Sequence, residues 1–459
     1  MSESAATNST PLDPSMSQDV VPIGEAVKAW FLISLQTFGG PAGQIAVMQR
    51  TLVDEKRWIG QRRFLHALNF CMLLPGPEAH QLAIYTGWLL NGVRGGLAAG
   101  TLFVLPGMVA LLALSAVYIA YGDTPVITGL FLGLAPAVIA IVVQAVDRVA
   151  RRALTRPALV VIAVGSFLAL ALFAVPFPLV VLAAGLVGLL LGRFGPVTSA
   201  AESGTETGPA PLVSDDQLHH ARPGAARTAL TLGVGLLAWA APLVAAGFAF
   251  GWNSIFIDQG LFFSGAALVT FGGAYAVLAY VAQQAVNTYA WLLPGEMVRG
   301  LALAETTPGP LIMVVQFVAF VGAYRAPGDL DPWLAATLAA LLTTWVTFVP
   351  SFLLVLLGAP YIERLRSNHT LGAALSGVTA AVVGVIANLA VYFSVHTLFE
   401  RAWRWQAGPF QITLPEVDSA IPITIGLTLL ALGLTFVAKW STLRVLGTCA
   451  ILGIVAGLV

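Results

Sequence analysis

Two Pro-Gly-Pro interruptions, at 75–77 and 308–310, hold most of the side chains that could do chemistry in this apolar chain. Glu78 directly follows the first, so its carboxyl group either stabilises the helix dipole or takes up and releases a proton. Glu305 precedes the second interruption, and Leu311 follows it. The helix that begins there therefore has free N–H groups with no local acid, and such an N-terminus is suited to binding an anion.

Other polar side chains lie near these interruptions. Arg62, His66 and Asn69 are spaced to share one helix face, and ionisable groups within apolar segments mark pathways or sites by default. Arg62 and Arg63 could instead lie at a membrane surface and extend into water. The residues predicted to bind a substrate are Gly39, Gly40, Asn69, Pro75, Gly76, Pro77, Gln81, Gly272, Gly273, Arg299, Thr306, Thr307, Pro308, Gly309 and Pro310. Glu78 and Glu305 are predicted to couple transport to protons, and Arg62, Arg63 and His66 to attract anions.

The chain is internally duplicated. Phe38-Gly39-Gly40 recurs as Phe271-Gly272-Gly273 and Pro75-Gly76-Pro77 as Pro308-Gly309-Pro310, and the shift in numbering is the same for both motifs (271−38 equals 308−75). The Gly-Gly pairs either break helices or allow close helix packing. Broken helices at matching places in two halves indicate the substrate site of a transporter.

The composition predicts a membrane protein. Of 459 residues, 58% are hydrophobic and only 10% charged, against about 25% charged in soluble domains. The zero net charge gives no sign of nucleic-acid binding. Cys71 and Cys449 stand alone, and the histidines, including the adjacent His219 and His220, show no ligand spacing, so we expect no disulfide, metal or cofactor.

Apolar segments predict the fold class: an all-α polytopic membrane protein of about 13 spans, built from two inverted repeats of about six spans that one extra helix joins. The parts are a disordered tail at 1–23, a first repeat at 24–192, a polar linker at 193–227, an orientation-flipping helix at 228–250 and a second repeat at 251–459. If the broken segments were re-entrant instead of spanning, the parity would change and the repeats would be parallel. The predicted spans lie near 26–46, 64–91, 96–120, 125–146, 157–175, 177–192, 229–249, 256–280, 297–323, 333–357, 371–396, 420–437 and 442–458.

The balance of basic residues predicts a cytoplasmic N-terminus and a periplasmic C-terminus. The cluster of Arg50, Lys56, Arg57, Arg62 and Arg63 opposes this choice, because a spanning segment at 26–46 would place it outside.

The runs Thr37-Phe38-Gly39-Gly40-Pro41 and Leu74-Pro75-Gly76-Pro77-Glu78 resemble the chromate ion transporter family, and Glu305-Thr306-Thr307-Pro308-Gly309-Pro310 looks like its second-half motif. The resemblance implies a long-chain, two-domain protein of the bacterial inner membrane that exports chromate, driven by the proton gradient or the membrane potential. Expected partners are chromate, its analogue sulfate and the lipid bilayer, with a homodimer left open.

Three alternatives remain at this stage. The nearest is a carrier of sulfate or another oxyanion that works by uptake or exchange, and the second is a passive anion channel. The third, a membrane enzyme that reduces chromate, would require cofactor ligands that the sequence does not supply, so we predict a transporter and not an enzyme.

Overall fold

The computed structural model describes residues 20–193, 212, 224–271, 273–359, 369–408 and 410–458. Most of the tail predicted at 1–23, most of the linker predicted at 193–227, with His219 and His220, and the candidate residue Gly272 lie outside the described residues. The rest of the chain is almost entirely helical, as its apolar composition requires, because only helices and closed barrels satisfy the backbone in a membrane.

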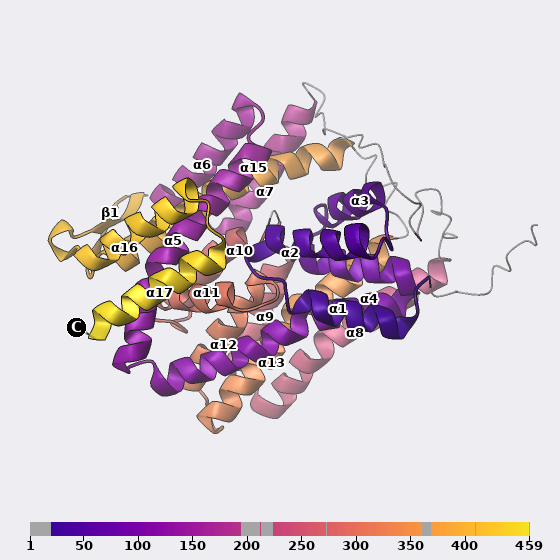
Figure 1. The fold of residues 1–459 in the computed structure, drawn as a ribbon, viewed down its shortest axis with the longest axis horizontal. Helices are drawn as coiled ribbons and strands as arrows, with labels where there is room; N and C mark the ends of the chain where they lie inside the picture. The colour runs from indigo at the N-terminus through magenta and orange to yellow at the C-terminus, as the bar shows by residue number, and fades with distance from the viewer. Residues whose placement is uncertain are drawn as a thin grey trace, which may run out of the picture.

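The helices lie close to the spans predicted at 125–146, 157–175, 177–192 and 229–249, whereas the spans predicted at 26–46 and 64–91 each contain two helices (Figure 1). The elements are α1 (Ile23–Ser34), α2 (Gly40–Gln49) with a π-helical turn (Arg50–Glu55), α3 (Gln61–Cys71), α4 (Glu78–Tyr121), α5 (Pro125–Ala153), α6 (Pro157–Phe173), α7 (Phe177–Gly192) and α8 (Ala225–Phe250).

The second repeat has the same order of helices and adds a pair of strands. Its elements are α9 (Ile255–Leu268), α10 (Ala274–Asn287), α11 (Glu296–Thr306), a 3₁₀ turn (Leu311–Met313), α12 (Val314–Arg325), α13 (Pro332–Gly358), α15 (His369–Leu398), β1 (Ala402–Ala407), β2 (Phe410–Pro415), a 3₁₀ turn (Val417–Ser419), α16 (Pro422–Leu432) with a π-helical turn (Gly433–Val437), and α17 (Thr442–Leu458).

The broken segments fold back on themselves. A Cβ atom placed on Gly300 of α11 would overlap the ring of Phe317 on α12, and one on Gly322 would lie 2.9 Å from Trp291. Residues well before the break are therefore neighbours of residues well after it, which requires that α11 and α12 lie side by side. The ring centroids of Phe70 and Tyr85, 5.4 Å apart, show the same for α3 and the start of α4.

The two Gly-Gly segments fold back in the same way. Phe262 of α9 lies 5.4 Å from Tyr280 of α10 between ring centroids, and Glu25 at the start of α1 pairs with Lys56 after α2 at 3.3 Å. We call these units hairpin 1 (α1 and α2), hairpin 2 (α3 and the first half of α4), hairpin 3 (α9 and α10) and hairpin 4 (α11 and α12).

Helix α4 is itself two helices. Asn91 and Gly92 have non-helical backbone angles, with φ of Gly92 at +61°, and Gly87 is so close to Gly95 that a Cβ on either would overlap the other's carbonyl oxygen. The first half therefore completes hairpin 2, and the second half runs back as a separate long helix. Asn91 at the reversal donates from Nδ2 to the Val21 carbonyl at 2.5 Å, which fixes the base of hairpin 2 beside that of hairpin 1.

Long apolar helices pack against the hairpins, as α13 does against α9 and α12. Within the described residues, five helices are long and apolar enough to cross a membrane: α4, α5, α8, α13 and α15. The shorter α6, α7, α16 and α17 are also apolar. These helices support the prediction of a polytopic membrane protein.

Helices of one repeat pack against helices of the other. Gly133 of α5 packs against Cys449 and Gly453 of α17, and Gly377 of α15 packs against Gly188 of α7, closely enough that a Cβ on either Gly133 or Gly377 would overlap backbone. Gly133 and Gly377 are matched residues of the two repeats, because the later part of each repeat, from Pro106 and Pro350 onward, has its own constant shift (377−133 equals 350−106). Such reciprocal pairing is typical of a two-fold relation, in which the same surface of each unit meets the other.

The strands β1 and β2 were not predicted. They lie between α15 and α16, where the sequence has no long apolar segment. Trp403, Trp405, Phe410 and Ile412 suit a strand, and Gly408, with φ at +57°, forms the turn. A search for long apolar segments misses strands this short.

Candidate functional site

The candidate site lies where the tips of the four hairpins meet. Each tip contains a glycine in a conformation that other residues rarely adopt: φ is +77° at Gly39, +125° at Gly76, +104° at Gly273 and +105° at Gly309. Glycine adopts such angles without steric cost. The sequence therefore ends each first arm and begins each second arm at the predicted breaks.

The tips of one repeat bond to the tips of the other. The Gly76 N–H donates to the Thr270 carbonyl at 2.7 Å, and the Gly309 N–H donates to the Thr37 carbonyl at 3.0 Å. Gly309 is the counterpart of Gly76 and Thr270 that of Thr37, since both pairs are related by the same shift in numbering as the repeated motifs (309−76 equals 270−37). Hairpin 2 therefore meets hairpin 3, and hairpin 4 meets hairpin 1, in equivalent ways.

Each Pro-Gly-Pro tip also packs against a long helix of the other repeat. A Cβ on Gly76 would lie 2.8 Å from Ser351 Oγ of α13, and one on Gly107 of α4 would overlap the Pro308 carbonyl. Gly107 and Ser351 follow Pro106 and Pro350, which lie inside α4 and α13. The absence of a side chain at Gly107 lets the second tip approach α4, so the prolines and glycines serve this contact.

Two glutamines hold the tips through side-chain amides. Gln81 donates from Nε2 to the Pro75 carbonyl at 2.6 Å, and Gln44 donates from Nε2 to the Gly309 carbonyl at 2.6 Å. Gln81 was a predicted binding residue and lies at the first tip as expected. Its Oε1 is buried without a partner among the described residues, so it remains free to accept a hydrogen bond.

Glu305 forms a buried pair with Tyr275 where the repeats meet. The Tyr275 hydroxyl donates to Glu305 Oε1 at 2.5 Å, and a Cβ on Gly40 of hairpin 1 would lie 3.8 Å from that hydroxyl. Glu305 is 2% exposed, and its Oε2 has no hydrogen-bond partner in the described structure. A buried carboxyl oxygen without a partner is costly, so a proton or a donor is expected there during the reaction cycle.

Glu78 has a different environment. It is half-buried in the first turn of α4, whose N-terminus carries no side-chain cap. The guanidinium of Arg152 on α5 is near enough to interact electrostatically with it. Arg148, one helical turn earlier on α5, interacts in the same way with Glu305 and Tyr275. The charges of these two arginines therefore interact with the acids near both tips.

The hydroxyls of Thr306 and Thr307 are used within their own helix. Thr306 Oγ1 donates to the Leu303 carbonyl at 2.8 Å and Thr307 Oγ1 to the Ala304 carbonyl at 2.9 Å. Each hydroxyl has one hydrogen to donate, so neither can donate to an anion without breaking this bond. Both residues do lie at the second tip, as predicted.

Arg299 lies apart from the second tip. Its Nη1 is 3.4 Å from the Tyr118 hydroxyl, and its guanidinium stacks over Phe131 at 5.7 Å. It precedes Thr306 by seven residues on α11, which is roughly 10 Å along a helix. Tyr118 in turn donates to Glu296, which pairs with Arg325 at 2.6 Å, so Arg299 belongs to a network at the base of hairpin 4.

The polar face of α3 is directed outward. Arg62 and Asn69 are exposed, His66 is half-buried and Arg63 is buried, so the predicted stripe of Arg62, His66 and Asn69 points away from the core. His80, one residue before Gln81, is fully buried between the rings of Phe103, Phe348 and Phe352. Packing between aromatic rings indicates a structural role for His80.

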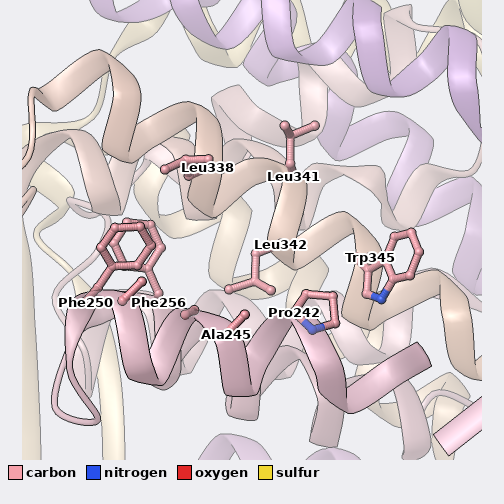
Figure 2. Close-up of a pocket in the computed structure, with 10 residues that line it drawn as sticks. Pro242, Ala245, Phe250, Phe256, Leu338, Leu341, Leu342 and Trp345 are labelled. Atoms are coloured by element: carbon pink, nitrogen blue, oxygen red, sulfur yellow. The ribbon is translucent and has the colours of Figure 1, made fainter. Parts of the chain in front are cut away.

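The cavity between α8, α9 and α13 is a poor site for an anion. It has a volume of about 390 Å³ and lies between α8, α9 and α13 (Figure 2). Its walls are apolar, with Pro242, Phe250, Phe256, Leu342 and Trp345 among the lining residues. A dianion would lose its hydration there without gaining hydrogen bonds.

Sequence reasoning missed several residues of the site. Thr37 and Thr270 could have been found, because they are related by the same shift in numbering as the repeated motifs. The sequence does not mark Tyr275, Gln44 or Arg148, because their roles depend on contacts between the repeats.

Comparisons with known proteins give the family. The model of the chromate transporter family matches residues 24–189 and 257–454. A chromate transport protein of Pseudomonas aeruginosa is 33% identical over 88% of this chain and 85% of its own length. A chromate transport protein of Cupriavidus metallidurans is 27% identical over 79% of this chain and 80% of its own, and a probable chromate transport protein of Synechococcus elongatus is 26% identical over 79% and 82%.

No solved structure matches the chain. The relatives are transport proteins and not enzymes, which confirms the prediction that this chain is not an enzyme. The resemblance of the break motifs is likewise confirmed, and the motifs that carry it form the hairpin tips. The chain is a multi-pass membrane protein that belongs to the chromate transporter family.

Proposed function

We propose that this protein exports chromate across the bacterial inner membrane and binds the anion where the four hairpin tips meet. The observation that carries the proposal is the reciprocal bonding of the tips, Gly76 to Thr270 and Gly309 to Thr37. A dianion needs several donors in place of its water. The uncapped N-terminus of α4 offers N–H groups beside one tip, and the 3₁₀ turn before α12 does so beside the other.

The cation of the site is assigned to Arg148, with Arg152 one turn further along α5. Arg148 is half-buried and donates from Nη2 to Gln144 at 3.1 Å, which leaves other N–H groups of its guanidinium for a ligand. Its charge interacts electrostatically with Glu305 and Tyr275. Arg299 keeps only the structural role that its contacts with Tyr118 and Phe131 support.

The membrane potential supplies a sufficient driving force. Moving one charge through 100 mV is worth about 2.3 kcal/mol. Two negative charges that leave a cell with a negative interior therefore gain about 4.6 kcal/mol per 100 mV, which sustains a concentration ratio above roughly a thousandfold. Export of a dianion needs no further coupling, although an acid at the site makes it respond to pH.

The hairpins support an inverted topology. The bases of hairpins 1 and 2 are joined by Asn91 and Val21. The second half of α4 leads from Asn91 to Tyr118, which bonds to Glu296 at the base of hairpin 4. This distance is about 40 Å at the rise of an α-helix, close to a full membrane thickness. Hairpins 1 and 2 therefore enter from one side and hairpins 3 and 4 from the other.

Because the broken segments fold back, they no longer count as membrane crossings. Four segments (the second half of α4, α5, α6 and α7) cross in the first repeat, and α8 adds a fifth crossing, so the second repeat is inverted although its broken segments do not span. The cluster from Arg50 to Arg63 now lies on the cytoplasmic side, near the hairpin bases. Of the described lysines and arginines, the ones placed outside are Arg299, Arg325, Arg401 and Arg404, which agrees with the positive-inside rule.

We expect reporter fusions or cysteine labels in the linker near Leu212 to report the cytoplasm, and those at Val459 to report the periplasm. A label at Arg57, between hairpins 1 and 2, separates the two topologies. Folded-back hairpins place it inside, whereas a spanning segment at 26–46 would place it outside. A label at Arg57 that reacts only from the periplasm would contradict the hairpin topology.

Everted vesicles that contain the full-length protein should take up chromate when an interior-positive potential is imposed, and cells should accumulate less of it. In the same assay, Arg148→Ala should raise the chromate concentration that gives half-maximal uptake about ten- to a hundredfold, because a hydrogen bond to a charged group is worth about 1.5–3 kcal/mol. Arg299→Ala is the control and should change it little. A chromate uptake rate that does not change with the membrane potential, or a preference for sulfate over chromate, would contradict the assignment.

A further inference from the structure

The hairpin of β1 and β2 has one apolar and one polar face. Residues opposite each other in an antiparallel pair share a face, and successive residues alternate. The pairs Trp403 with Leu414, Trp405 with Ile412 and Ala407 with Phe410 alternate with Arg404 opposite Thr413 and Gln406 opposite Gln411. The large apolar side chains therefore all lie on one face, which we call the tryptophan face (Trp403, Trp405, Phe410, Ile412 and Leu414).

The tryptophan face is open. Trp403 is 47% exposed, Trp405 and Phe410 are 41% exposed and Leu414 is 38% exposed. An isolated two-stranded hairpin is marginally stable in water, and exposed contiguous apolar patches mark interaction sites. The first repeat has only the short turn Leu154–Arg156 between the corresponding helices, so the repeat fold itself does not require these strands.

The hairpin lies at the ends of the apolar helices. Phe410 packs against Phe173, the last residue of α6, with ring centroids 5.0 Å apart. A bridge between Phe399 and Ala420 closes its base directly after α15 and before α16. The strands are thus held at the level where the apolar helices end, which is where a membrane surface begins (Figure 1).

The opposite face is also exposed at Arg404 and Gln406, and one hydrogen bond joins it to the rest of the protein. Arg404 donates from Nη2 to Asn287 Oδ1 at 3.1 Å, at the end of α10. The polar side of the hairpin is therefore anchored on hairpin 3.

We propose that the tryptophan face inserts into the headgroup and upper acyl region of the surrounding leaflet and binds phospholipid. Tryptophan is enriched at this depth, because its ring is apolar and its N–H can still reach water. A second copy of the chain is a weaker occupant. Aromatic side chains bury about 150–250 Å² each, so the three half-exposed ones offer roughly 300 Å² in all, against about 800 Å² per partner in a stable interface.

The test places environment-sensitive labels on single cysteines in the full chain, reconstituted in vesicles of phosphatidylethanolamine and phosphatidylglycerol. Trp403→Cys and Leu414→Cys report the tryptophan face, and Gln406→Cys and Gln411→Cys are matched controls on the other face of the same strands. The unsubstituted chain, whose Cys71 and Cys449 are buried, provides the blank. Two labels per face keep the result readable if one substitution disturbs the strands.

Labels at 403 and 414 should show a blue-shifted emission, lose quenching by aqueous iodide and be quenched by nitroxide lipids, whereas labels at 406 and 411 should respond mainly to iodide. Equal iodide quenching at all four positions would overturn the proposal. Labels at 403 and 414 that are shielded from iodide but not quenched by nitroxide lipids would also overturn it, since a protein would then cover the face. The result does not depend on chromate transport.

Discussion

Gly76→Ala should nearly abolish chromate export, whereas Gly265→Ala should leave it intact. Alanine at φ +125° is strained by about 1–3 kcal/mol. Its Cβ would also lie 2.7 Å from Gln81 Nε2 and 2.8 Å from Ser351 Oγ. Both effects act on the tip that donates to Thr270, so the two repeats should no longer meet in the correct geometry. Chromate uptake by everted vesicles measures the loss.

Two further glycines serve as matched controls. Gly273→Ala has the strained angle, with φ at +104°, but no atom within 4 Å of its Cβ, and should lose export only in part. Gly265→Ala in α9 has neither strain nor a contact within 4 Å and should export normally. Full activity of Gly76→Ala at normal membrane abundance would show that the tip geometry is not part of the transport site.

Glu305→Gln should remove the pH dependence of transport. An ionised carboxylate at the tips repels a dianion, so export by the unsubstituted protein should fall as the pH rises and the carboxyl loses its proton. Glutamine cannot lose a proton there, and it can still accept from Tyr275. The variant should therefore keep, at high pH, the rate that the unsubstituted protein has at low pH. Initial uptake rates across a pH series in everted vesicles test this.

Glu78→Gln is the comparison that separates the two acids. The sequence favoured Glu78 for proton coupling because it follows the first break. In the structure Glu78 is half-buried and near Arg152, whereas Glu305 is 2% exposed with an unpartnered oxygen. We therefore expect Glu78→Gln to retain a pH-dependent rate. A flat profile for Glu78→Gln together with a normal profile for Glu305→Gln would reverse the assignment.

The sequence alone determined the local structure. Apolar composition and length placed α7 at 177–192 and α17 at 442–458, as the structure has them. The constant shift in numbering between repeated motifs identified the duplication, and the Gly-Gly and Pro-Gly-Pro motifs identified all four tips. These properties are local: burial in lipid demands apolar side chains along a helix, and a break demands residues that tolerate unusual backbone angles.

Only the tertiary structure decided how the segments are arranged. Two apolar half-helices have the same composition whether they continue end to end or lie side by side, so the sequence could not show that α11 folds against α12. The pairing of Glu305 with Tyr275 and the separation of Arg299 from the second tip depend on contacts between residues far apart in the chain. The strands at 402–415 escaped notice because their alternating side chains meet a surface on one face only, and that pattern is lost in a search for continuous apolar spans.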